Sequence, residues 1–422
     1  MTSDPLAING GRPVRSGEPI PLAQVCWDEA EQEAIQRVFE SGAFCSAYPQ
    51  ATEVKALEQE FARAVGVSYA VAFSSGTTAQ HAALVALGVG PGDQVIVPPL
   101  TFISTAYTVL IAGAVPVFAD VCRDTITIDP QDIRSKITPH SRAVVPVHWF
   151  GHPADMEAIA SIAAERGLSV IEDCAHGPGI TLNGRQAGSF GQIACWSLQQ
   201  SKMLTAAGEG GMATTDDDAL AARLRQVRDH GKATAQQMPS DFVAGYRITA
   251  LGNNYRLSEM HAAFARAQLS KLPEFTERRR KAHTALRERL GQIPSLEFQA
   301  CRPGAGLSYA YFPVLFPRES FSQPVKVIHE AMHAEGVVTH PIALEELCHV
   351  HPLFAEAAGR ATAPAFRWRG DAPLPAYGRG TLPVAEKIAD ELLLLPLHPH
   401  LSERDLDDIV AATRKVADAF RR

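Results

Sequence analysis

Between about residue 55 and residue 230, helix-like stretches alternate with short apolar runs. The runs are apolar on both faces, which is typical of strands covered on both sides of a sheet. Helices between such strands predict an α/β fold with a mostly parallel sheet of seven strands. The expected helices are 53–65, 76–87, 103–112 and 153–166, and the expected strands are 69–73, 93–98, 114–121, 142–148, 168–176, 192–199 and 211–216.

The pattern changes after about residue 250. Residues 256–290 read as one long helix, which we expect to be interrupted or kinked at Pro273, because proline lacks the amide hydrogen that a helix interior needs. Shorter alternating segments and a terminal helix follow at 310–316, 336–340 and 403–420. We expect a large α/β domain over 1–259, with an N-terminal arm over about 1–30, and a smaller α+β domain over 260–422. The Pro- and Gly-rich stretch 363–384 is expected to be a loop near the site or an interface.

Composition narrows the possible partners. The chain has 422 residues, 39 basic and 46 acidic, for a net charge of -7, and its mean hydropathy is -0.04. Without a basic patch, nucleic acid is not an expected partner. No apolar stretch approaches the roughly 20 residues of a membrane span, and no secretory signal pattern opens the sequence. Seven scattered cysteines predict a reducing, cytoplasmic setting without disulfides.

Histidines raise the question of a metal site. His148 and His152 lie in HWFGHP, and a second group contains His340, His349 and His351. Neither group has acidic or cysteine ligands at a definite spacing in the sequence. We therefore expect no metal.

Three strand ends carry polar residues that suit one cofactor. Ser75, Gly76 and Thr77 follow a strand and open a helix, where backbone amides bind phosphate, although plain helix capping is the commoner use of such residues. Asp173 ends a buried strand, where it would either meet a cationic ring nitrogen or cap a loop. Lys202 lies between an apolar run and glycines, where burial would lower its pKa and make it a nucleophile. Phosphate, ring nitrogen and aldehyde are the three groups of pyridoxal phosphate that need partners.

Longer motifs carry a family resemblance. They run over nearly the whole chain in this order: SSGTTAQHAAL, GDQVIVPPLTFIST, AGAVPVFADV, VPVHWFG, VIEDCAHGPG, GSFGQIACWSLQQSK, TAAGEGG, LGNNYRLSEMHAAFARAQL and LPLHP. With these motifs the chain resembles the DegT/DnrJ/EryC1/StrS aminotransferases. The resemblance implies fold type I (the aspartate aminotransferase-like fold) and pyridoxal 5'-phosphate as cofactor.

The resemblance also implies roles for individual residues. Lys202 would bind the cofactor covalently and act as general base and acid, and Asp173 would pair with the ring nitrogen. The other implied cofactor contacts are His176 near the ring hydroxyl, Gly76, Thr77 and Ser197 at the phosphate, Phe102 against the ring, and Asn254 reaching the phosphate of a neighbouring subunit. The last contact predicts a homodimer with shared active sites.

The substrate expectation rests on the segment before Lys202. Family members that act on nucleotide-linked sugars often have FSFHxxK there, whereas this chain has WSLQQSK. Gln199 in this segment resembles the branch that transfers an amino group from L-glutamine (or L-glutamate) to a keto-cyclitol of the scyllo-inosose type, as in aminoglycoside antibiotic biosynthesis. The alternatives are a nucleotide-linked keto-sugar aminotransferase, a 3-amino-5-hydroxybenzoate synthase-like enzyme and, outside the enzymes, a cofactor-sensing regulator. Candidate substrate contacts are Gln199, Tyr255, Arg256 and Tyr311.

Overall fold

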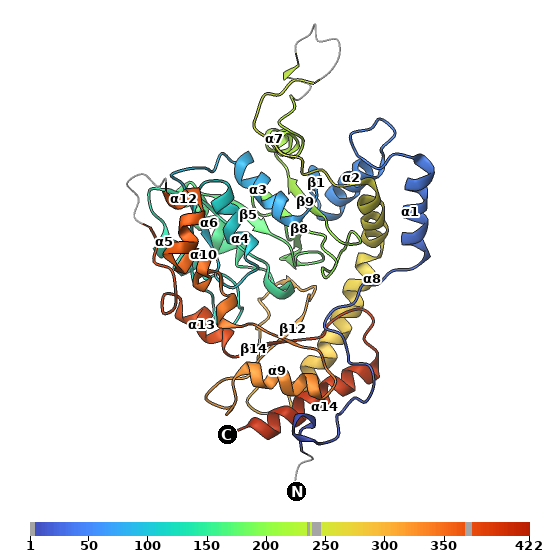
Figure 1. Ribbon diagram of the computed structural model, residues 1–422, viewed down its shortest axis with the longest axis vertical. Coiled ribbons are helices and arrows are strands. Elements are labelled where there is room, and N and C mark those ends of the chain that lie inside the picture. The colour runs from blue at the N-terminus through green and yellow to red at the C-terminus, as the bar shows by residue number, and fades with distance from the viewer. Residues whose placement is uncertain (1–4, 234–236, 239–245, 368–373) are drawn as a thin grey trace.

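The computed structural model describes residues 5–233, 237–238, 246–367 and 374–422. Its centre is a seven-stranded sheet in the order β1-β9-β8-β5-β4-β2-β3 (Figure 1). Strand β9 is antiparallel to both neighbours and the other six share one direction, as expected. In sheet order the strands are β1 (Tyr69–Phe73), β9 (Gly211–Thr215), β8 (Ile193–Ser197), β5 (Ser169–Asp173), β4 (Ser141–Val144), β2 (Gln94–Val97) and β3 (Val115–Phe118).

Helices cover both faces of this sheet because successive strand residues point to opposite sides. Val71 and Phe73 pack with one group of helices, whereas Ala70 and Ala72 pack with the other. The first face carries α3 (Gly76–Ala86), α4 (Ser104–Ile111) and α7 (Asp218–Arg228); the second carries α2 (Glu53–Val65), α5 (Pro130–Lys136), α6 (Met156–Arg166) and the first half of α8 (Glu259–Leu290). Helix α1 (Glu29–Ser41) packs against α8.

Helix α8 runs without interruption for 32 residues through Pro273, so of the two outcomes expected there the interruption is wrong, and the kink stays a prediction. Pro273 is exposed, and a carbonyl that has lost its amide partner can be hydrated at such a position. Tertiary packing also holds both halves of the helix. Ala262 and Ala265 lie in the core shared with α2, whereas Leu286 and Leu290 lie in the core of the C-terminal sheet.

The C-terminal region contains an antiparallel sheet in the order β10-β12-β14-β13. Alternate residues of β14 enter two cores: Leu393 and Leu395 pack toward α9 and α14, and Leu392 and Leu394 pack toward the large sheet. Because the second core is shared, the domain boundary at residue 259 stays a prediction. The elements are β10 (Glu297–Phe298), β12 (Phe312–Leu315), α9 (Val325–Ala334), β13 (His340–Pro341), β14 (Leu392–Leu395) and α14 (Glu403–Phe420).

Short elements join the two regions. A three-stranded sheet pairs β6 with β11, and thereby links the two halves of the chain. The stretch 363–384, expected to be a loop, contains one short helix and the start of another, and residues 368–373 of it lie outside the described part. The remaining short elements of the described chain are η1 (Ala7–Asn9), η2 (Trp149–Gly151), β6 (Thr181–Leu182), β7 (Arg185–Gln186), β11 (Ala305–Gly306), η4 (Leu344–Glu346), η5 (Cys348–Val350), α10 (Pro352–Ala355), α11 (Ala357–Thr362), α12 (Pro364–Arg367) and α13 (Pro383–Ala389).

Two further expectations concern the whole chain. None of the helices within the described ranges is long and apolar enough to cross a membrane. All seven cysteines are free in the structure.

Candidate active site

A cavity of about 810 Å³ lies where β1, β5 and β8 end. In an open parallel sheet, ligands bind outside the carboxyl ends of the strands. Residues 75–77 after β1, Asp173 at the end of β5 and Ser197 at the end of β8 all line this cavity, together with Lys202. The structure therefore brings the three separate sequence signals into one place.

Asp173 is buried and firmly held. Its Oδ2 accepts hydrogen bonds from Gln80 Nε2 at 2.5 Å and Thr105 Oγ1 at 2.8 Å, and its Oδ1 accepts from the amide of Ala175 at 3.0 Å. Neither Gln80 nor Thr105 was expected from the sequence. A signal for Gln80 was present, because it lies one helical turn after Gly76 and therefore on the same face of α3.

Lys202 lies in the turn that follows β8. Its amide donates to the carbonyl of Gln199 at 2.9 Å, and its Nζ lies 2.9 Å from Nε2 of His176. Burial lowers the pKa of the Lys202 amine, although the Asp173 carboxylate acts in the opposite direction. The neutral, nucleophilic form is thus more accessible than in an exposed lysine.

His176 is enclosed by aromatic rings. It stacks on Trp149 with ring centroids 4.9 Å apart and an interplanar angle of 21°, and it meets Tyr311 edge-on at 5.8 Å. Burial and the neighbouring Lys202 hold the pKa of His176 well below its usual value, so the ring is neutral. If Lys202 donates to Nε2, the ring proton is on Nδ1, and this buried atom has no partner among the described residues.

Close backbone approach shapes the phosphate end of the cavity. Ser75 caps α3 and accepts from the amide of Thr78 at 3.1 Å, so capping and a phosphate cup coexist here. A Cβ on Gly76 would lie 2.9 Å from Cβ of Ser197, a separation too short for two carbon atoms. Gly76 therefore lets the start of α3 approach the end of β8, with Thr77 beside it in the cavity wall.

The remaining predicted residues divide into two groups. Phe102, Gln199 and Tyr311 line the cavity, and Phe102 keeps 65% of its surface exposed. Asn254, Tyr255 and Arg256 do not line it. Asn254 is exposed, Tyr255 Oη lies 3.1 Å from His81 Nδ1, and Arg256 pairs with Asp229.

These residues fit pyridoxal phosphate. Lys202 offers an amine beside the cavity, Asp173 offers a fixed carboxylate at its floor, and the unpartnered Nδ1 of His176 suits a ring oxygen. The start of α3 presents free backbone amides to a phosphate, and the lack of a side chain at Gly76 keeps that approach open.

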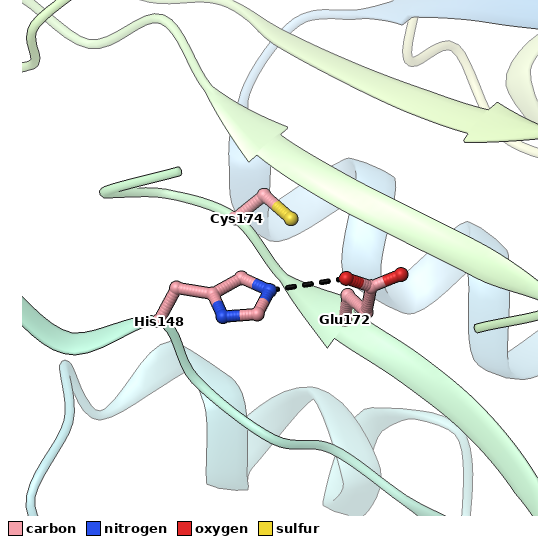
Figure 2. A group of neighbouring side chains, drawn as sticks. All are labelled: His148, Glu172 and Cys174. Atoms are coloured by element: carbon pink, nitrogen blue, oxygen red, sulfur yellow. Dashed lines mark hydrogen bonds and ion pairs between the residues drawn. The ribbon is translucent and has the colours of Figure 1, made fainter. Parts of the chain in front are cut away.

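A second polar cluster lies on the other face of β5 (Figure 2). Ligand atoms of His148, Glu172 and Cys174 lie within 4.8 Å of one another, so the structure supplies the acidic and cysteine neighbours that the sequence spacing of His148 did not reveal. Glu172, however, already accepts four hydrogen bonds, and burial raises the pKa of the Cys174 thiol well above its usual value. The donors to Glu172 are His148 Nε2 at 3.0 Å and the amides of Gly188 at 2.8 Å, Phe190 at 2.7 Å and Gly191 at 2.7 Å. A metal ion would have to displace this network.

Comparison with known proteins adds to this geometry. Residues 25–414 match the DegT/DnrJ/EryC1/StrS aminotransferase family. A UDP-N-acetyl-3-dehydro-alpha-D-glucosamine 3-aminotransferase of Acidithiobacillus ferrooxidans is 36% identical over 364 residues, covering 86% of this chain and 88% of that protein. A dTDP-3-amino-3,4,6-trideoxy-alpha-D-glucose transaminase of Streptomyces venezuelae is 32% identical, covering 91% of each. The crystal structure of a 3-amino-5-hydroxybenzoic acid synthase superposes with a TM-score of 0.81 at 28% identity, covering 96% of this chain and 99% of that one.

Fold, cavity and likeness agree on the class of protein, which is a fold-type I, pyridoxal-phosphate-dependent aminotransferase. Such an enzyme uses an amino donor and a keto acceptor. The chain belongs to the DegT/DnrJ/EryC1/StrS aminotransferase family, because the family match covers most of its length.

Proposed function

We propose that this enzyme transfers an amino group from L-glutamate or L-glutamine to the keto group of a nucleotide-linked sugar. The observation that carries the proposal is the likeness, over most of the chain, to two relatives whose names specify UDP- and dTDP-linked sugars. The cavity volume of about 810 Å³ lies toward the upper end of the range for ligand pockets. That volume suits a cofactor together with a large acceptor.

The keto-cyclitol is the competing acceptor, and Gln199 was the reason to expect it. In the structure Gln199 Oε1 accepts hydrogen bonds from both the amide and the hydroxyl of Ser201, each at 2.7 Å. The glutamine thus stabilises the turn before Lys202, a role that is independent of the acceptor. Gln199 therefore gives the cyclitol less support than the sequence suggested.

We assign the proton transfers to Lys202. When bound, pyridoxal phosphate supplies an electron-accepting ring that stabilises charge on the donor's Cα. Lys202 would hold the cofactor and, once the donor amine has replaced it, its freed amine would take the proton from the donor's Cα as a general base and deliver it as a general acid to the cofactor carbon bonded to the donor nitrogen. The lowered pKa of Lys202 supports its roles as nucleophile and as general base, because the amine must be neutral to attack the cofactor and to accept the proton.

The other residues of the cavity would hold the ring and the phosphate of the cofactor beside Lys202. Asp173, fixed by Gln80 and Thr105, would keep the ring nitrogen protonated. Phe102 would contact the ring, and His176 Nδ1 would donate to its oxygen. Gly76, Thr77 and Ser197 would hold the phosphate, and Tyr311, which also lines the cavity, remains a candidate substrate contact.

A second copy of the chain would complete the site. Asn254 is exposed and outside the cavity, so in its proposed role it would serve the active site of a partner. The segment that leads to it carries exposed apolar side chains, with Tyr246 at 71%, Ile248 at 50% and Leu251 at 90% exposure. These side chains support a homodimer, in which Tyr255 and Arg256 would lie near the shared site. The free cysteines support a cytoplasmic enzyme.

The acceptor is tested with the purified enzyme loaded with pyridoxal phosphate. We expect L-glutamate or L-glutamine, together with a panel of UDP-, dTDP- and GDP-linked keto-sugars, to give an amino-sugar product detected by mass spectrometry. A parallel panel holds keto-cyclitols, and Lys202→Ala serves as the inactive control. Product from cyclitols alone would contradict the proposal.

A further inference from the structure

His148 contacts both carboxylate-bearing residues at the end of β5. Its ring Nε2 lies 3.0 Å from Glu172 Oε2, and its backbone amide donates to the carbonyl of Asp173 at 3.1 Å. The ring's other nitrogen, Nδ1, accepts from the amide of Ala154 at 3.2 Å. An accepting Nδ1 places the ring proton on Nε2, so His148 donates to Glu172 across the contact drawn in Figure 2.

The residue after His148 reaches the active site. Trp149 begins η2, in which Phe150 adopts a left-handed backbone conformation with φ of 57°, an unfavourable one for an aromatic residue. The surrounding contacts must therefore hold this turn in place. The Trp149 ring stacks on His176 at 4.9 Å, and His176 Nε2 lies 2.9 Å from Lys202 Nζ.

These contacts form a continuous path from a buried hydrogen-bond network to the reactive amine. We propose that His148, anchored on Glu172, is a positioning residue that holds Trp149 against His176 and thereby keeps Lys202 desolvated and oriented. The inference rests on the proposed role of Lys202 as the cofactor-binding lysine. His148 touches neither the cavity nor the cofactor, and acts through Trp149.

The test measures how fast the cofactor-free protein captures pyridoxal phosphate on Lys202, as a function of pH, from the visible absorbance of the lysine-bound cofactor. Capture requires the neutral amine. The other titratable side chains in the cavity wall are Asp173, His176, Cys195, Glu209, Tyr311, His340, Glu346 and His351. His148→Asn keeps an acceptor for Ala154 but cannot reach Glu172. We expect it to raise the midpoint of the pH profile and to slow capture about three- to tenfold at pH 7.5, the effect of a rise of about half to one pKa unit.

Two variants separate positioning from general damage to the fold. His148→Gln places an amide nitrogen near the original Nε2 and is expected to restore the wild-type midpoint. Trp149→Leu leaves the Glu172 network intact but removes the stacking ring of a half-buried residue. It is expected to raise the midpoint, as His148→Asn does. Trp149→Leu therefore still tests the inference if His148→Asn fails to fold.

The chain provides a control in a second histidine–glutamate pair, His349 Nε2 and Glu386 Oε1, 3.1 Å apart, in which the histidine side chain is fully buried and the glutamate is partly exposed. His349 does not line the cavity, so His349→Asn is expected to lower the melting temperature without moving the midpoint. A His148→Asn profile identical to that of His349→Asn would overturn the inference. So would a stoichiometric metal ion in the purified wild-type protein that His148→Asn loses. Wild-type protein that captures no cofactor would instead refute the proposed role of Lys202.

Discussion

At the scale of single residues, Gly76 lies so close to Ser197 that the proposed phosphate site leaves no room for a side chain at position 76. Gly76→Ala would place a Cβ 2.9 Å from Cβ of Ser197 and 3.3 Å from the carbonyl oxygen of Trp196. We expect cofactor affinity to fall about tenfold, which corresponds to about 1.4 kcal/mol, because the start of α3 must move away from β8. Titration with pyridoxal phosphate measures the change. In the control Gly90→Ala the nearest atom would be 3.8 Å away, and affinity equal to that of Gly76→Ala would contradict the argument.

Asp173 is predicted to have two separable effects. Its carboxylate raises the pKa of Lys202 against the lowering effect of burial, so Asp173→Asn should move the midpoint of cofactor capture to lower pH. The same change should lower kcat about a hundredfold or more, since a preorganised charge partner is lost. The pH profile of capture and steady-state kinetics check the two parts. A midpoint that moves to higher pH would contradict the assigned effect of the Asp173 carboxylate on the pKa of Lys202.

The sequence predicted the residues at the strand ends of the site better than the residues that contact them in space. Lys202, Asp173 and Gly76 lie at strand ends, where one rule of α/β folds places ligands, and the structure brought them into one cavity. The partners that fix them were not predictable in the same way. Glu172 meets His148 from 24 positions away, and only the register of neighbouring strands determines that contact.

At the scale of elements, the start of helix α2 depends on another helix. Its N-cap residue Thr52 makes no side-chain capping bond. Glu259 of α8 instead accepts from the amides of Glu53 at 2.6 Å and Val54 at 3.2 Å. Glu259→Ala should therefore lower the free energy of unfolding by about 1–3 kcal/mol, the cost of leaving buried donors unsatisfied.

Denaturant unfolding measures this loss. The control is Glu277→Gln at a position on α8 with an exposed side chain, where a change within about 0.5 kcal/mol is expected. Equal effects of the two substitutions would show that Glu259 does not cap α2.

Elements with strong local signals were predicted to the residue. The expected helices 53–65 and 403–420 and the strand 69–73 match the structure, because a clear hydrophobic period ends at glycine or begins at a capping serine. Strand 142–148 ends early, at Val144, although Val147 still forms an isolated parallel bridge with Asp173. The helix also continues through Pro273, where packing on both halves of α8 outweighs the lost hydrogen bond.

At the scale of the whole molecule, the N-terminal arm is attached to the C-terminal region at Glu335. This buried carboxylate accepts from the amides of Ala7 at 2.8 Å and Val14 at 3.0 Å, and from Lys415 Nζ at 2.9 Å. Glu335→Ala should release the arm and speed tryptic cleavage after Arg15 several-fold, whereas the bond after Arg12 precedes Pro13 and resists trypsin. Exposed Glu330 on the same helix provides the control, Glu330→Ala. Unchanged cleavage of the Glu335 variant would contradict the proposed attachment.

Dimer formation is the second prediction at this scale. Leu251 is 90% exposed in the segment that would reach a partner, so Leu251→Asp should weaken the dimer and reduce activity in proportion to the monomer formed. Light scattering at several concentrations measures both species. A wild-type protein that is monomeric and fully active would rule out shared active sites.

Borohydride reduction followed by peptide mass mapping gives the most direct test of the central claim, that Lys202 is the group through which this enzyme carries out transamination. The protein is loaded with pyridoxal phosphate and reduced either before or after incubation with L-glutamate. We predict a reduced cofactor adduct on the peptide containing Lys202, which is largely lost when the donor is added first. An adduct on another lysine, or an adduct on Lys202 that the donor leaves unchanged, would contradict the account.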